Sequence, residues 1–303
     1  MRFQALRFTF QVSPPAPLRR VPAIKPRRFA FTLTELLVVI SIIGLLAGLA
    51  VPAIKNLGKS NLQVSATRQL VDDIARARQL AVSQRTTVYM VFVPQDFWLV
   101  GGNPSWWNSL SYDQKYAATN LLDKQCTGYT FVTLRSVGDQ PGQGRARYIG
   151  EWKSLPDGAF IATNKFNTAY WPYHNHAPYP YYPGYNSYPV IDAPLNADYP
   201  INSFSTNALP FPTPTNSSVL LPYIAFNYLG QLTVDGVDIA QQDEYIPLAQ
   251  GAVSYATDVD KALVLGPADF AENPPGNSTN SMFNIIRIDR LTGRTTLLQQ
   301  KVQ

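Results

Sequence analysis

Residues 27–56 read RRFAFTLTELLVVISIIGLLAGLAVPAIKN. Within them, residues 36–54 form a run of 19 whose only clearly polar side chain is Ser41. As a helix rising about 1.5 Å per residue, this run spans roughly 28 Å, close to the hydrocarbon thickness of a bilayer. Glu35 stands at the start of the run, where an ionised group is costly unless it is paired. The segment therefore predicts a membrane helix that carries an unexplained carboxylate.

The positive charge of the chain is concentrated ahead of this segment. The formal net charge is +5, yet residues 1–30 contain seven of the 25 basic residues and none of the 20 acidic ones. The positive-inside rule predicts that the helix crosses the membrane once, with the N-terminus in the cytoplasm and the body of the chain outside. The body is slightly acidic, so no nucleic-acid partner is predicted for it. A single cysteine, Cys126, excludes an internal disulfide framework.

The apolar helix carries features that suit contact with other helices. Gly44 and Gly48 form a small-xxx-small pair, which lets another helix approach closely in lipid. Pro52 is expected to bend the helix. A simple signal anchor explains the helix but does not explain Glu35.

Two other kinds of signal fit these residues poorly. A secretory signal cut near residues 51–53 would have an unusually long apolar core and a proline in its cleavage motif. A twin-arginine signal could use Arg27 and Arg28, but the residues that follow depart from that motif.

The residues Ala30-Phe31-Thr32-Leu33-Thr34-Glu35, between a basic leader and an apolar helix, resemble the type IV prepilin signal. In that family a membrane-embedded peptidase cuts before the Phe, methylates the new amine and leaves the helix in place. The resemblance implies cleavage between Ala30 and Phe31 and N-methylation of Phe31. It also implies that Glu35 pairs with the α-amine of a neighbouring subunit during assembly. The family usually has Gly before the cut, where this chain has Ala30.

The helix is expected to continue as an amphipathic segment over residues 55–85. Apolar residues recur there at helical spacing, at Leu70, Ile74, Ala77 and Ala81. Asp72 and Asp73 are expected to be solvated acids on the outer face of this helix.

After Arg85 the pattern changes to short runs rich in β-branched and aromatic residues. Strands are predicted at residues 86–93, 97–100, 129–137, 219–228 and 283–289, and a short helix at residues 110–123. Leu229-Gly230 and Thr292-Gly293 are predicted hairpin turns, in which Gly supplies a positive φ. Together these elements predict an α+β fold, with a long N-terminal helix packed on an antiparallel sheet or sandwich-like domain.

Three stretches make the resemblance more specific. ARARQLAVSQRTTVYMVF, IAFNYLGQLT and IRIDRLTGRTTLL are similar to sequences of minor pseudopilins of the GspH/FimT type. That resemblance implies a β-sandwich-like domain and a minor place in a type II secretion pseudopilus or a type IV pilus. The implied partners are the prepilin peptidase, other pseudopilins or pilins, the assembly platform and membrane lipid.

Residues 170–215 do not fit the family pattern. They hold 10 of the 25 prolines and 8 of the 17 tyrosines, a composition that favours extended or turn backbone. One interpretation is a loop that binds a partner or a glycan. The other, which needs fewer assumptions, is an irregular insertion packed by its own tyrosines.

No enzymatic site is predicted. His174 and His176 lack a third metal ligand, and the acids Asp235, Asp238, Asp243 and Glu244 fit no defined calcium loop. No cofactor or metal is expected. The predicted order is a cleaved leader (1–30), a transmembrane helix (31–54), its amphipathic continuation (55–85) and an extracytoplasmic domain (86–303). The chain is predicted to be a structural pilin-like subunit; the alternative is a membrane-tethered binding module that forms no filament.

Overall fold

The computed structural model describes residues 32–102, 105–135, 138–139, 144–166, 203–236, 238–277 and 284–299, with backbone alone at residues 49–61 and at a few other positions. The chain divides into two compact units, Met1–Ala53 and Ile54–Gln303. A single helix, α1 (Leu33–Gln84), supplies the described part of the first unit and continues into the second. The long N-terminal helix predicted from the sequence is thus confirmed.

The predicted membrane span at residues 31–54 is only partly described and stays a prediction. Within the part of the chain that the structure describes, no helix combines the length and the apolar character needed to cross a membrane. Residue 31 and the side chains of residues 49–54 lie outside the described part.

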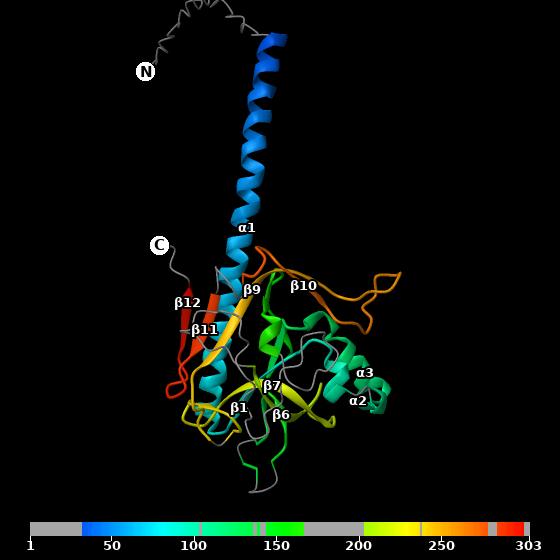
Figure 1. The fold of residues 1–303 in the computed structure, drawn as a ribbon, viewed down its shortest axis with the longest axis vertical. Coiled ribbons are helices and arrows are strands. Elements are labelled where there is room, and N and C mark those ends of the chain that lie inside the picture. The colour runs from blue at the N-terminus through cyan, green and yellow to red at the C-terminus, as the bar shows by residue number, and fades with distance from the viewer. Residues whose placement is uncertain are drawn as a thin grey trace, which may run out of the picture. The chain divides into compact units, whose positions relative to one another are not determined.

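The second unit is built on two antiparallel sheets (Figure 1). In the first, the order is β3-β2-β1-β7-β6, with β4 beside β2 and β8 beside β7; in the second it is β10-β9-β11-β12, with β5 beside β9. The strands of the first sheet are β1 (Val88–Phe92), β2 (Gly128–Thr133), β3 (Arg147–Tyr148), β4 (Lys153–Ser154), β6 (Ser205–Pro210), β7 (Ser218–Phe226) and β8 (Leu232–Thr233). Those of the second are β5 (Ala159–Ile161), β9 (Glu244–Ser254), β10 (Asp269–Glu272), β11 (Asn284–Ile288) and β12 (Thr295–Gln299).

Short helices cover one face of the first sheet. They are η1 (Phe97–Gly102), α2 (Ser105–Ser109), α3 (Tyr112–Thr119) and η2 (Leu122–Lys124), while η3 (Thr163–Phe166) follows β5. A capping box starts α3: Ser111 accepts from the N–H of Gln114, and the Gln114 side chain accepts from the N–H of Ser111. This is the short helix that the sequence predicts at residues 110–123.

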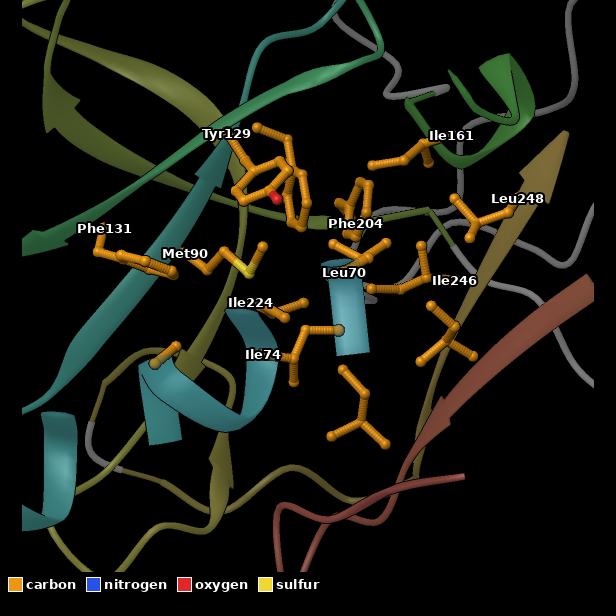
Figure 2. Packing of buried hydrophobic residues seen from close by; sticks show 14 of the residues in the cluster. Leu70, Ile74, Met90, Tyr129, Phe131, Ile161, Phe204, Ile224, Ile246 and Leu248 are labelled. Atoms are coloured by element: carbon orange, nitrogen blue, oxygen red, sulfur yellow. The ribbon is translucent and has the colours of Figure 1, made fainter. Parts of the chain in front are cut away.

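The C-terminal part of α1 supplies the centre of the main core. The predicted stripe of Leu70, Ile74, Ala77 and Ala81 is fully buried. Leu70 and Ile74 lie between side chains of the first sheet, such as Met90, and side chains of β9 (Figure 2). Burying such large side chains stabilises the fold by about 1.5–3 kcal/mol each.

Strand β1 is buried on both faces, which explains why apolar residues occupy all five of its positions. Val88, Met90 and Phe92 face α1 and the second sheet. Tyr89 and Val91 face a second core, formed with the short helices. Alternate residues of a strand point to opposite faces, so β1 joins the two cores.

Two predicted elements differ from the structure. Residues 97–100 form the 3₁₀ helix η1 instead of a strand, because the chain turns at Asp96 (φ +54°) and buries Phe97 and Trp98 in the second core. Residues 205–210, which the sequence assigns to an irregular insertion, form β6 at the edge of the first sheet. An edge strand tolerates proline at its end, as at Pro210.

The two predicted hairpin turns are present and lie against each other. Gly230 (φ +79°) lies between β7 and β8, and Gly293 (φ +61°) lies between β11 and β12. A Cβ at Gly293 would collide with the carbonyl oxygen of Gly230. Arg78 of α1 joins this contact, because its Nε donates to the carbonyl oxygen of Thr292 at 2.6 Å. The close approach therefore requires glycine at Gly293, and the positive φ favours glycine at both positions.

Candidate assembly site at the start of the first helix

The start of α1 is a capping box built from Thr32 and Glu35. Glu35 Oε2 accepts from the backbone N–H of Thr32 at 3.1 Å and from its Oγ1 at 3.0 Å. The Thr32 Oγ1 in turn accepts from the N–H of Glu35 at 3.2 Å. These bonds satisfy backbone N–H groups that have no hydrogen-bond partner within the first turn of a helix. The helix dipole also favours a negative charge at this end. Glu35 thus has a local role in starting the helix, which was not predicted from the sequence.

The first turns of α1 expose apolar side chains in the first unit. Leu33 is 80% exposed, and nine more large apolar side chains between residues 36 and 46 are 45–68% exposed. A Cβ placed on Gly44 or Gly48 would meet nothing within 4 Å. This surface is open to a partner, and the predicted roles of Gly44 and Gly48 in helix packing stay predictions.

Other predicted features of the N-terminal segment are only partly described. Ala30 and Phe31, the predicted cleavage junction and methylation site, lie outside the described residues. α1 continues through Pro52, whose predicted role as a bend point stays a prediction.

A buried polar network fixes α1 to the first sheet in the second unit. Asp73 is 6% exposed; its Oδ2 accepts from the Tyr129 hydroxyl at 2.7 Å and its Oδ1 pairs with Lys153 Nζ at 2.6 Å. Gln69 Nε2 donates to the same tyrosine hydroxyl and to the carbonyl oxygen of Ser154. Burial, and then the hydrogen bond to Asp73, raise the pKa of Tyr129 above its ordinary value. The prediction that Asp73 is a solvated acid is therefore wrong, while Asp72 is exposed as predicted.

A second buried ion pair lies near residues 166 and 203. Residues 167–202, between them in the sequence, are outside the described part. Lys165 Nζ pairs with Glu244 and lies 4.8 Å from the ring centroid of Phe204. Phe204 donates its N–H to the carbonyl oxygen of Lys165 at 3.0 Å and stacks on Phe92 at 4.5 Å. Burial lowers the pKa of Lys165 and raises that of Glu244, and the charge of each opposes the shift of the other. The two ends of the segment are thus joined at a packed base.

The other chemical candidates are dispersed or outside the described residues. His174 and His176 are not described. Asp243 binds Arg287 at 2.7 Å, and Glu244 pairs with Lys165, so these two acids are engaged with separate cations. No cluster of three potential metal ligands occurs in the described ranges.

The roles of Thr32 and Asp73 were not predicted from the sequence. The spacing T-x-x-E at residues 32–35 is a capping-box signature that was available from the sequence. Asp73 gave no such signal, because its partners Tyr129 and Lys153 are distant in the chain.

Comparison with known proteins supports the interpretation of the N-terminal segment. Residues 25–51 match the family model described as the prokaryotic N-terminal methylation motif. No curated protein and no solved structure matches the chain. The match includes residues 30, 31 and 35, and the motif supports a type IV pilin-like protein.

Proposed function

We propose that the chain is a minor pilin-like subunit of the GspH/FimT type, acting in a type II secretion pseudopilus or a type IV pilus. Prepilin peptidase cuts between Ala30 and Phe31 and methylates Phe31. The leader 1–30 is lost, and residues 31–54 anchor the subunit in the inner membrane before it enters the filament. The observation that carries the pilin-like part of this proposal is the methylation-motif match at residues 25–51. The GspH/FimT type rests on the resemblance of the three stretches quoted from the sequence.

Glu35 is proposed to select the neighbour during assembly. Its Oε2 is held by Thr32, which fixes the carboxylate at the first turn of α1. A methylated α-amine from an incoming subunit would meet this carboxylate in apolar surroundings. Pairing would neutralise both charges, whereas an amine without its partner would remain as a buried charge.

The amine-pairing role and the capping role of Glu35 can be separated by substitution. Glutamine also forms a capping box, so Glu35→Gln keeps the bonds to Thr32 and removes only the charge. A lost pairing of about 3 kcal/mol would depress incorporation roughly 100-fold. Glu35→Asp keeps the charge on a shorter side chain and should be partly tolerated.

Two measurements test the function. Intact mass from cells with and without prepilin peptidase should show loss of residues 1–30 and gain of one methyl group only when the peptidase is present. Co-purification with the major filament subunit should fail for Glu35→Gln, and should remain normal for Asp72→Asn, an exposed acid on the same helix. An uncut leader in both strains rejects the pilin function. Wild-type incorporation of Glu35→Gln rejects the amine pairing and favours a tethered binding module.

A further inference from the structure

Four arginines gather where α1 ends in the second unit. Arg85 is the first residue after α1, and Arg135, Arg145 and Arg147 belong to the hairpin that joins β2 to β3. All four are exposed. In Figure 1 this hairpin, in green, extends beyond the last turn of α1. We call the four residues the arginine corner.

The hairpin holds its three arginines close to one another. Arg147 pairs with Thr133 across the two strands. Further along, the strands approach so closely that a Cβ on Gly144 would lie 2.5 Å from the carbonyl oxygen of Leu134 and 2.8 Å from Cγ of Arg135. Arg145 follows Gly144 directly, so it lies beside Arg135.

The end of α1 is bonded to the same hairpin. The hydroxyl of Thr86, the residue after Arg85, donates to the carbonyl oxygen of Arg135 at 3.1 Å and lies 3.3 Å from the hydroxyl of Thr133. These contacts fix the backbone of Arg85 next to that of Arg135. All four arginines are therefore available to a single partner.

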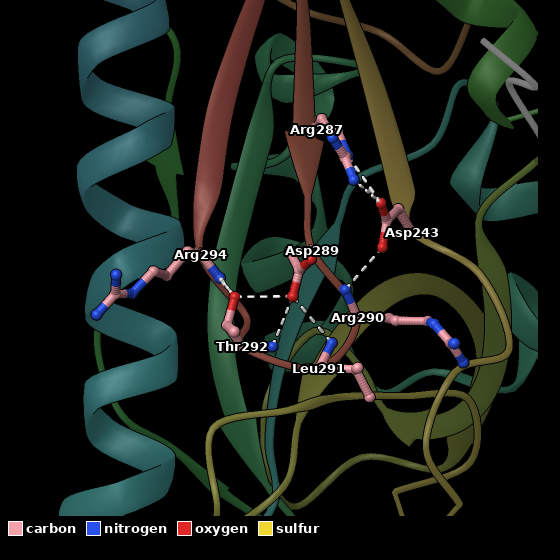
Figure 3. Close-up of polar contacts among 7 residues, drawn as sticks. All are labelled: Asp243, Arg287, Asp289, Arg290, Leu291, Thr292 and Arg294. Carbon is pink, nitrogen blue, oxygen red and sulfur yellow. Dashed lines mark hydrogen bonds and ion pairs between the residues drawn. The ribbon is translucent and has the colours of Figure 1, made fainter. Parts of the chain in front are cut away.

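The arginine corner keeps most of its positive charge. Among the described residues, no ion pair joins any of the four arginines to a carboxylate. Asp139 lies beside them and accepts from the backbone N–H of Arg145 at 3.2 Å. Four arginines and this one carboxylate have a net charge of +3. In the second sheet, by contrast, Arg287 has an acid of its own and binds Asp243 at 2.7 Å (Figure 3).

Such a group of arginines does not serve the stability of the fold. Like charges that face each other across a hairpin repel, which destabilises the pair of strands. Each guanidinium group is a planar fork that binds a carboxylate through two parallel hydrogen bonds. The arginine corner therefore suits a partner that supplies several carboxylates.

The charge of the rest of the chain favours an acidic protein over a nucleic acid. Residues 31–303 contain 18 basic residues, which is 25 less the seven of residues 1–30, and all 20 acidic ones. A long polyanion would bind the arginine corner and be repelled by the slightly acidic body around it. A short acidic patch on a protein meets the arginines alone.

We propose that the arginine corner binds an acidic surface of a different subunit in the same filament. The two chains differ, so the contact occurs once and does not repeat, as a minor subunit requires. Its place at the C-terminal end of α1 puts the partner beyond the end of the helix instead of along its side. Complementary charge brings the two subunits together quickly and in one orientation. The inference rests on the proposed filament function.

Carbodiimide coupling in membranes that contain the full-length chain tests the contact. The reagent joins a lysine amine to a carboxylate that touches it. Arg147→Lys keeps the charge and adds an amine, so it should couple to an Asp or Glu of another protein that has its own N-terminal methylation motif. Coupled peptides identify that protein by mass spectrometry. The matched control is Arg76→Lys, at an exposed position on α1, and coupling should exceed it roughly fivefold.

Peptide binding distinguishes an acidic protein from a nucleic acid. The full-length chain in detergent should bind a short polyglutamate peptide, as measured by fluorescence anisotropy. Arg135→Glu combined with Arg147→Glu should weaken binding roughly tenfold or more. Arg68→Glu combined with Arg76→Glu changes the net charge equally at exposed positions of α1 and should have little effect. Tighter binding of a DNA duplex of equal charge, lost in the first variant alone, overturns the proposal in favour of a nucleic-acid site.

The other outcomes separate the contact from the filament function. Coupling no greater than that of Arg76→Lys overturns the contact, as does coupling to a second copy of this chain or to a protein without the methylation motif. Leader cleavage is scored by intact mass in the same cells. Cleavage without coupling rejects only the contact. An uncut leader rejects the filament function, and the peptide measurement then still decides whether the arginine corner binds carboxylates.

Discussion

Asp72 and Asp73 are adjacent on α1, yet their carboxylates meet different surroundings. Asp73 accepts from the buried hydroxyl of Tyr129, while Asp72 is exposed. We expect Asp73→Ala to lower the free energy of unfolding by about 3 kcal/mol, because it leaves that hydroxyl without its acceptor. Asp72→Ala should change it by less than about 0.5 kcal/mol. Urea unfolding of the full chain in detergent measures both, and equal effects would contradict the buried network.

Asp289 makes the β11–β12 turn sensitive to acid. Hydrogen bonds from the hydroxyl and N–H of Thr292, and from the N–H of Leu291, hold the pKa of Asp289 below its ordinary value. Because the folded-state pKa is depressed, the stabilisation is present above the ordinary value of about 4 and is lost as pH falls through the folded-state pKa. The amide signal of Thr292 should therefore titrate below pH 4 and should be flat in Asp289→Asn. A titration centred above pH 4 would mean that these bonds do not favour the ionised form.

Among the elements, residues 165–166 contact Phe204, which lies within the Tyr- and Pro-rich residues 170–215. The rings of Phe166 and Phe204 lie 5.3 Å apart, and a backbone hydrogen bond joins Lys165 to Phe204. Replacing residues 168–201 with a short Gly/Ser linker should leave the melting temperature unchanged or higher, because closing a shorter loop costs less entropy. Phe204→Ala is the destabilising control, at about 3–5 kcal/mol. Loss of the fold in the shortened chain would show that the segment contributes to the core.

The local sequence pattern predicted the elements that have strong local signals. The periodicity of Leu70 and Ile74 predicted a buried helix face, and Gly230 and Gly293 predicted turns, because each signal lies within a few residues. Strand β9 was missed because Pro247 and Gly251 interrupt its apolar pattern. The start of α1 was predicted. Its capping box was not, although the spacing of Thr32 and Glu35 indicates one. The pairing of Asp73 depends on residues brought together only by the fold.

For the whole molecule, the buried stripe of α1 begins at Ala66, well beyond the apolar segment. A shortened chain that starts at Asn61 should therefore fold without detergent, because it keeps every described α1 side chain of the main core. Its amide NMR spectrum should be well dispersed, and Leu70 and Ile74 should remain protected from hydrogen exchange. A collapsed spectrum would mean that residues before Asn61 are needed to fold the second unit.

The position of α1 inside the core has a mechanical consequence. Tension carried along the helix reaches five side chains, from Ala66 to Ala81, that are packed on two sides. These contacts are loaded in shear at the same time, so they resist together, whereas a helix on the surface would peel away one turn after another. We expect single-molecule pulling between residues 54 and 299 to show one abrupt rupture at high force, governed by the unfolding rate. A series of small steps at low force would mean that the helix leaves the core one turn at a time.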